Sequence, residues 1–151
     1  MVRSLDLGGK AMDIMLLTRK GYCCSQIMAI LMLREMGREN PELVRAMGGL
    51  CYGLGYSGDT CGALAGGACL ISLLAGKGAD DQSEKAPVPL MLTELVDWFR
   101  GRTEAPYGSM KCDDILAASP DKSACLELVS KTYDKVLSIL AAHGLEPLKV
   151  S

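Results

Sequence analysis

The spacing of apolar residues is the feature that most constrains this fold. In the stretch 87–99, Leu92, Leu95, Val96 and Phe99 recur at the intervals of three and four that place side chains on one face of an α-helix. β-Strands would need alternating β-branched and aromatic residues, whereas aromatic residues make up only 5% of the chain. The pattern therefore predicts an all-α fold.

Capping residues and helix breakers divide the chain into predicted elements. Glycine, proline and N-cap signals predict helices that include residues 7–19, 23–36, 41–47, 60–76 and 87–99. Gly101 is expected to stop the helix over 87–99, and residues 102–111 to form a loop. A short helix is expected over 112–118. A last helix is expected to start at Ser119 and Pro120 and to stop at Gly144. We expect a single all-helical domain over residues 1–151, a compact bundle of five or six helices with an exposed linker around 77–86.

A glycine-rich stretch precedes the predicted central helix. Five glycines fall within residues 48–59, too many for a stable isolated helix. We expect an irregular, partly buried loop. The spacing Gly53-x-Gly55-x-x-Gly58 matches a dinucleotide-binding fingerprint formally, but no strand precedes it, so that interpretation is rejected.

Charge and hydropathy exclude several classes of partner. The chain has 16 basic and 18 acidic residues, so we expect no nucleic-acid binding. The longest uncharged run, residues 60–76, is shorter than the 20 or so apolar residues of a membrane helix, and a buried helix without membrane insertion is expected. Residues 1–8 lack the apolar core of a signal peptide. We therefore expect an uncleaved, cytoplasmic protein.

The cysteines carry the chemistry that the sequence offers. Seven are present, none spaced as C-x-x-C, so the usual thioredoxin-like and zinc-knuckle motifs are absent. Four lie at or near predicted helix starts, where free N–H groups and the helix dipole favour thiolate over thiol. Thiolate is both the nucleophilic and the metal-ligating form. These four candidate site residues are Cys24, Cys61, Cys112 and Cys125.

The other three cysteines are predicted to be packing or accessory residues. Cys69 lies eight residues after Cys61, about 12 Å along the same helix, too far for a disulfide; we expect it to be a small buried apolar residue. Cys23 and Cys24 are adjacent, so on a helix their side chains would point about 100° apart. Only one of them is expected to face a shared site. The role of Cys51 stays open.

The hexapeptide from Cys61 to Gly66 reads Cys-Gly-Ala-Leu-Ala-Gly. With one cysteine before it and two after it, this motif resembles that of the C_GCAxxG_C_C family of redox-active proteins. The resemblance extends over roughly residues 11–141 and places the family's four cysteines on Cys24, Cys61, Cys112 and Cys125. It implies redox activity and, by analogy with related haem- and cluster-bearing domains, an iron–sulfur site.

The leading hypothesis is thiol redox chemistry. The four cysteines would converge, and at least one pair would cycle between dithiol and disulfide, as in a thiol-dependent oxidoreductase. Cys61 is the predicted nucleophile. Gly62 and Gly66 are the predicted cofactor-binding residues, because glycines let a substrate or cofactor approach the backbone.

Two alternatives stay open at this point. The same four thiolates could ligate an iron–sulfur cluster or zinc, in an electron-transfer or structural role. Otherwise the chain could be a non-catalytic helical binding module in which cysteine and methionine fill the core. Under the thiol-redox hypothesis we expect a redox partner that the sequence does not identify. Substrate, electron donor and homo-oligomer formation are not specified by the sequence.

Overall fold

The computed structural model describes residues 7–149, and within that range it is all-α, which confirms the predicted fold class. Its only β-type pairing there is an isolated bridge between Thr60 and Lys111. The described residues form seven α-helices, where a bundle of five or six was expected, and two of the seven have only seven residues each. The elements are α1 (Leu7–Arg19), α2 (Cys24–Glu35), α3 (Pro41–Met47), α4 (Gly62–Ala75), α5 (Val88–Tyr107), α6 (Cys112–Ala118) and α7 (Ser123–Ala142), with 3₁₀ turns η1 (Gly48–Leu50) and η2 (Pro147–Lys149).

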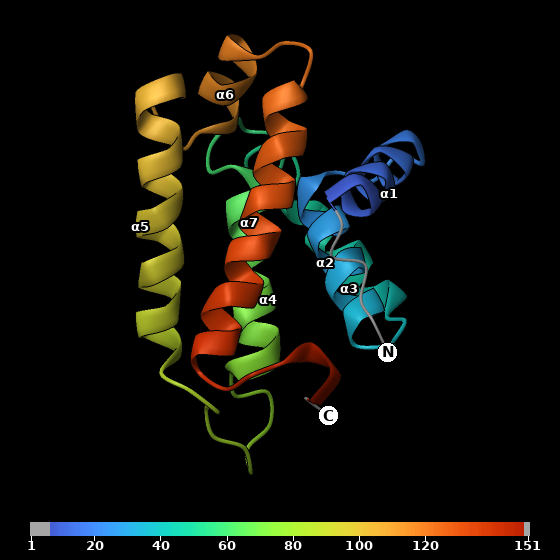
Figure 1. Ribbon diagram of the computed structural model, residues 1–151, viewed down its shortest axis with the longest axis vertical. Helices are drawn as coiled ribbons and strands as arrows, with labels where there is room; N and C mark the ends of the chain where they lie inside the picture. The colour runs from blue at the N-terminus through green and yellow to red at the C-terminus, as the bar shows by residue number, and fades with distance from the viewer. Residues whose placement is uncertain (1–6, 150–151) are drawn as a thin grey trace.

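Helix α4 is the centre of the bundle. It packs against α2, α5 and α7, and Figure 1 shows it behind α7, with α5 to one side and α2 to the other. Two adjacent glycines allow these neighbours to come close. A Cβ on Gly66 would lie 3.0 Å from the Cα of Ser25 in α2, and a Cβ on Gly67 would lie 3.1 Å from the Val136 side chain in α7. Small residues on α4 therefore set the distances between the central helices.

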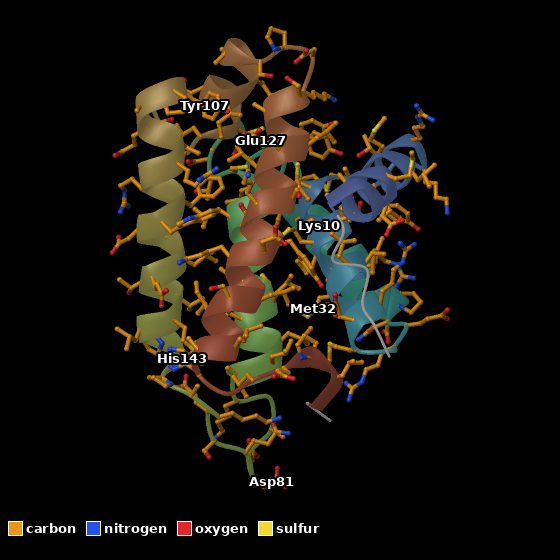
Figure 2. The ribbon with its side chains drawn as sticks, viewed as in Figure 1. Lys10, Met32, Asp81, Tyr107, Glu127 and His143 are labelled. Atoms are coloured by element: carbon orange, nitrogen blue, oxygen red, sulfur yellow. A yellow bond between two sulfur atoms is a disulfide. The ribbon has the colours of Figure 1, made fainter. Side chains whose placement is uncertain are left out.

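Helix α1 packs on the bundle through one charged side chain and two buried apolar ones. Lys10 forms an ion pair with Asp134 of α7 and donates a hydrogen bond to the carbonyl oxygen of Ser130 at 3.3 Å. Figure 2 shows the labelled Lys10 between α1 and α7. On the inner side of α1, Ile14 and Leu17 are buried in the core.

Helix α5 is longer than predicted. It continues through Gly101 to Tyr107 and ends at Gly108, whose φ of 88° lies in the left-handed region. Leu95, Phe99 and Thr103 follow one another at intervals of four and are all fully buried. Their burial outweighs the cost of about 1 kcal/mol for a glycine inside a helix. The prediction that Gly101 ends this helix, with a loop over 102–111, is therefore wrong.

Helix α7 begins later than predicted, at Ser123 instead of Ser119 and Pro120. The preceding residues form a turn that satisfies the first N–H groups of the helix. Asp121 Oδ1 accepts from the Ser123 N–H at 3.0 Å, and Ser119 Oγ accepts from the Ala124 N–H at 3.1 Å. The polar residues that predicted a helix start thus lie before the helix.

Residues 77–86 contain no helix or strand, and most of their side chains are exposed. In Figure 2, Asp81 of this segment lies at the lower end of the molecule, far from α6 at the upper end. None of the described helices is long and apolar enough to span a membrane. The prediction about a leader segment rests on residues 1–8, of which 1–6 lie outside the described range.

Two glycine-to-alanine changes test the central packing. Gly66→Ala puts a Cβ against the backbone of α2, so it should lower the free energy of unfolding by about 1–3 kcal/mol. Gly101→Ala serves as the control, because its Cβ would meet nothing within 4 Å; it should raise stability by about 0.5–1 kcal/mol. Urea unfolding monitored by circular dichroism measures both changes. Equal effects of the two substitutions would contradict the packing described for α2 and α4.

Candidate functional site

Four helix starts gather at one end of the molecule. The starts of α2, α4 and α7 and the short helix α6 lie toward the upper end of Figure 1. A cavity of about 210 Å³ opens there, and all four predicted site cysteines line it. Gly62, Tyr52 and Lys122 also line the cavity, and much of the remaining wall is apolar. These predicted site cysteines are Cys24, Cys61, Cys112 and Cys125, and Cys23 lines the cavity as well.

Backbone hydrogen bonds bring Cys61 and Cys112 to the same place, although 51 positions separate them in the chain. The Cys61 N–H donates to the Met110 carbonyl at 3.0 Å, and the Cys112 N–H donates to the Asp59 carbonyl at 2.7 Å. Gly58, with φ of 77°, allows this pairing, because a Cβ there would overlap the carboxylate of Asp113. The starts of α4 and α6 are therefore joined directly.

Cys24 is positioned by the contact between α2 and α4. A Cβ on Gly62 would lie 3.4 Å from the Cβ of Cys24. The absence of a side chain at Gly62 therefore lets α2 pack closely against α4 at Cys24. The hydroxyl of Ser25 donates to the Met47 carbonyl at 2.7 Å and fixes the first turn of α2. Cys24 and Cys61 thus lie together at the starts of adjacent helices, and we call them the deep pair.

The environment of the deep pair keeps both thiols protonated. Burial raises the pKa of Cys61 to about 11 and outweighs the backbone N–H groups of Ala63 and Leu64, which lower it. Burial also raises the pKa of Cys24 far above its usual range, and the neighbouring cysteine sulfurs add to that shift. The expectation that helix starts favour thiolate here is wrong, because loss of hydration outweighs the helix-start N–H groups.

Cys112 and Cys125 form what we call the rim pair. Both are partly buried, and burial is the main cause that raises the pKa of each thiol. Lys122, the residue before α7, lowers the pKa of both. On Cys112 the carboxylate of Asp113 acts in the opposite direction. The rim pair therefore has a cation beside it.

Lys122 is itself held over the cavity by an aromatic side chain. Its Nζ donates a hydrogen bond to the Tyr52 hydroxyl at 3.1 Å and lies 5.2 Å from the centre of that ring. The hydrogen bond to Tyr52 raises the pKa of Lys122, which keeps the ammonium charged. Tyr52 stacks in turn on Tyr56, with ring centres 5.0 Å apart.

Cys23 and Cys51 form a disulfide, with Cα atoms 5.8 Å apart. The prediction that both are packing or accessory residues did not foresee this bond, and no spacing in the sequence signals it. Cys23 also lines the cavity, so the expectation that only one of Cys23 and Cys24 faces a shared site is wrong. Cys23 is the N-cap of α2 with extended backbone angles, so the helical separation of about 100° does not apply to it.

The remaining predicted residues lie elsewhere. Cys69 is exposed on α4 beside Leu73, which corrects the prediction that it is buried. Because nearly every residue of α4 is apolar, its sequence does not mark which side is exposed. Gly66 lies in the contact with α2 instead of lining the cavity. His143, the only histidine, lies at the opposite end of the molecule in Figure 2.

Comparison with protein-family models identifies the family of this chain. The model described as "Putative redox-active protein (C_GCAxxG_C_C)" matches residues 22–139. The chain belongs to this family. Searches of curated proteins and of solved structures each found no significant match.

Metal binding would require the four cavity cysteines of this C_GCAxxG_C_C protein to come close enough together to ligate one ion or cluster. Within residues 7–149, no group of three or more His, Cys, Asp or Glu side chains lies close enough together to hold a metal ion. As placed, the cysteines do not fit an iron–sulfur cluster or zinc.

The raised pKa of Cys61 predicts a pH dependence of stability. In the unfolded chain the thiol ionises near pH 9, and in the folded protein near pH 11. Its contribution to stability is therefore complete below pH 9 and is lost as the pH rises toward 11. We expect the unfolding free energy of the native protein to fall relative to Cys61→Ala by about 1 kcal/mol between pH 8 and pH 10. Parallel pH profiles of the two proteins would contradict the assignment.

Proposed function

We propose that this C_GCAxxG_C_C protein is a thiol-dependent oxidoreductase whose four cavity cysteines carry out dithiol–disulfide chemistry. The observation that supports it most is that four cysteines from four separate helix starts line one cavity. Nothing in the packing of an all-α core requires four separate chain segments to contribute cysteine at the same point. The family description supports redox activity in general terms.

Entry of electrons or of a partner is assigned to the rim pair. A thiol must ionise to attack a disulfide. Burial raises the pKa of Cys61 to about 11; it also raises the pKa of Cys112 and Cys125, but there the ammonium of Lys122 opposes the shift. We therefore assign the role of nucleophile to the rim pair instead of to Cys61, the nucleophile predicted from the sequence. The deep pair, in which Cys61 is buried and Cys24 is partly buried, serves as a second dithiol.

The reaction conserves atoms and electrons with a disulfide-bearing partner. One rim thiolate attacks a partner sulfur, forms a mixed disulfide and expels the other partner sulfur as thiolate. The second rim thiolate then attacks the rim sulfur of the mixed disulfide and releases the second partner thiolate. Two electrons pass to the partner, two protons leave the rim thiols, and a Cys112–Cys125 disulfide remains.

Disulfide mapping tests the proposal. Oxidised glutathione added to the native protein should produce a peptide that links Cys112 and Cys125, and a dithiol should reverse the link. Cys112→Ser and Cys125→Ser should each stop at a glutathione adduct on the remaining rim cysteine. Cys69→Ser, a change at an exposed cysteine outside the cavity, should behave as the native protein. If no disulfide forms among the four cavity cysteines, the proposal fails.

A second substitution tests the role of the cation. Lys122→Gln removes the charge beside the rim pair, so the pH midpoint for alkylation of Cys112 and Cys125 should rise by about half a unit or more. Lys131→Gln, on an exposed part of α7, is the matched control and should leave the midpoints unchanged. Equal midpoints in all three proteins would show that Lys122 does not activate the rim thiols.

A further inference from the structure

The Cys23–Cys51 disulfide lies beside the thiol cavity but is not part of the four-cysteine set. It joins the N-cap of α2 to the residue that follows η1. Cys51 is buried, whereas Cys23 is partly exposed and lines the cavity. A second pair of sulfur atoms therefore borders the proposed site.

The residues that follow Cys51 adopt a left-handed backbone. Five consecutive residues, Tyr52–Tyr56, have φ between 53° and 76°. For residues other than glycine this conformation is unfavourable, because the Cβ comes too close to the following carbonyl oxygen, and it occurs here at Tyr52, Leu54 and Tyr56. Such conformations persist only where surrounding structure fixes them. We call Tyr52–Tyr56 the left-handed segment.

Hydrogen bonds anchor the left-handed segment to its two ends. The Tyr56 N–H donates to the Cys51 carbonyl at 2.9 Å, and the Gly58 N–H donates to the Tyr52 carbonyl at 3.0 Å. Cys51 is in turn fixed to α2 by the disulfide. The covalent bond thus fixes the residue from which the segment starts.

The left-handed segment places one side chain over the cavity. Tyr52 lines the cavity and meets Lys122 through the hydrogen bond of 3.1 Å. Lys122, with φ of 66°, is the fourth and last non-glycine residue of positive φ among those described. Three of these four residues belong to the left-handed segment, and the fourth, Lys122, contacts it. We call the contact between Tyr52 and Lys122 the cover.

We infer that the Cys23–Cys51 disulfide is a second redox site of this protein, and that its oxidation state controls access to the deep pair. While the bond is intact, it holds the left-handed segment and keeps Tyr52 against Lys122. After reduction, residue 51 is no longer tied to α2, the segment relaxes from its left-handed conformation, and the cover opens. The inference rests on the proposed function only because both concern the same cavity.

The reductant is a dithiol, and the exchange is balanced. A reductant thiolate attacks Sγ of Cys23, the more exposed of the two sulfurs, and the S–S bond breaks with Cys51 leaving as thiolate. The second reductant thiol resolves the mixed disulfide and releases Cys23. The protein gains two electrons and two protons, and the dithiol becomes a disulfide.

Alkylation rates test the inference directly. Native protein with the disulfide intact is treated with N-ethylmaleimide at neutral pH, and the labelling of each cysteine is followed by peptide mass spectrometry. After reduction of Cys23–Cys51 and removal of the dithiol, Cys24 and Cys61 should be labelled about tenfold faster. Cys69, outside the cavity, should be labelled at the same rate in both states. Unchanged rates at Cys24 and Cys61, or an equal rise at Cys69, would overturn the inference.

Two further variants separate opening of the cover from loss of structure. Tyr52→Phe removes the hydroxyl that Lys122 contacts but keeps the disulfide, so it should accelerate labelling of the deep pair without any reductant. Tyr56→Phe is the matched control, because Tyr56 is 72% exposed and does not line the cavity; it should leave the rates unchanged. No acceleration in Tyr52→Phe, or the same acceleration in Tyr56→Phe, contradicts the role of the cover.

These experiments are independent of the proposed oxidoreductase activity. Alkylation reports access to thiols and not their oxidation, so the cover can be verified even if the rim pair forms no disulfide. Conversely, a reversible Cys112–Cys125 disulfide together with unchanged alkylation rates would leave the proposed function standing and remove only the control by Cys23–Cys51.

Discussion

The close approach of α2 and α4 at Gly62 and Gly66 is the contact on which the rest of the structure depends. It brings the start of α2 against the start of α4 and so places Cys24 beside Cys61. The same central helix carries Gly67 against α7, whose first turn supplies Cys125. The two glycines of the family motif therefore allow close helix packing, and this packing brings the cysteines together around the cavity.

The cavity shows two opposing influences on thiol chemistry. Helix starts supply N–H groups that favour thiolate, yet burial outweighs them at Cys61 and raises its pKa. At the rim, burial is less complete and Lys122 contributes a charge that lowers the pKa of both thiols. Burial therefore raises the pKa of all four thiols, and the charge of Lys122 opposes that shift at both members of the rim pair. Lys122 therefore has two effects. Its charge lowers the pKa of the rim thiols, and its contact with Tyr52 covers the deep pair.

Much of the fold and the membership of the cavity could be predicted from the sequence, for identifiable reasons. Apolar spacing is a local property, so the helix over 7–19 and the short helices 41–47 and 112–118 are predicted with their observed bounds. The four cysteines are predicted because one begins a recognisable motif, one precedes it and two follow it in a fixed order. Features that depend on tertiary packing could not be predicted from the sequence. The extension of α5 past Gly101 depends on burial of Thr103, and the Cys23–Cys51 bond depends on how the glycine-rich stretch folds back onto α2. Exposure of Cys69 depends on which face of an apolar helix remains uncovered.

The central claim is that the cavity thiols exchange electrons reversibly, and a redox titration tests it most directly. The protein is equilibrated in buffers of graded dithiol-to-disulfide ratio, quenched with acid, and the remaining thiols of the four cavity cysteines are counted by mass spectrometry. The account predicts a single reversible transition in which Cys112 and Cys125 lose their thiols together, with the slope of a two-electron couple, about 30 mV per tenfold change in ratio. Retention of all four thiols over the whole range, with Cys23–Cys51 alone responding, would contradict it.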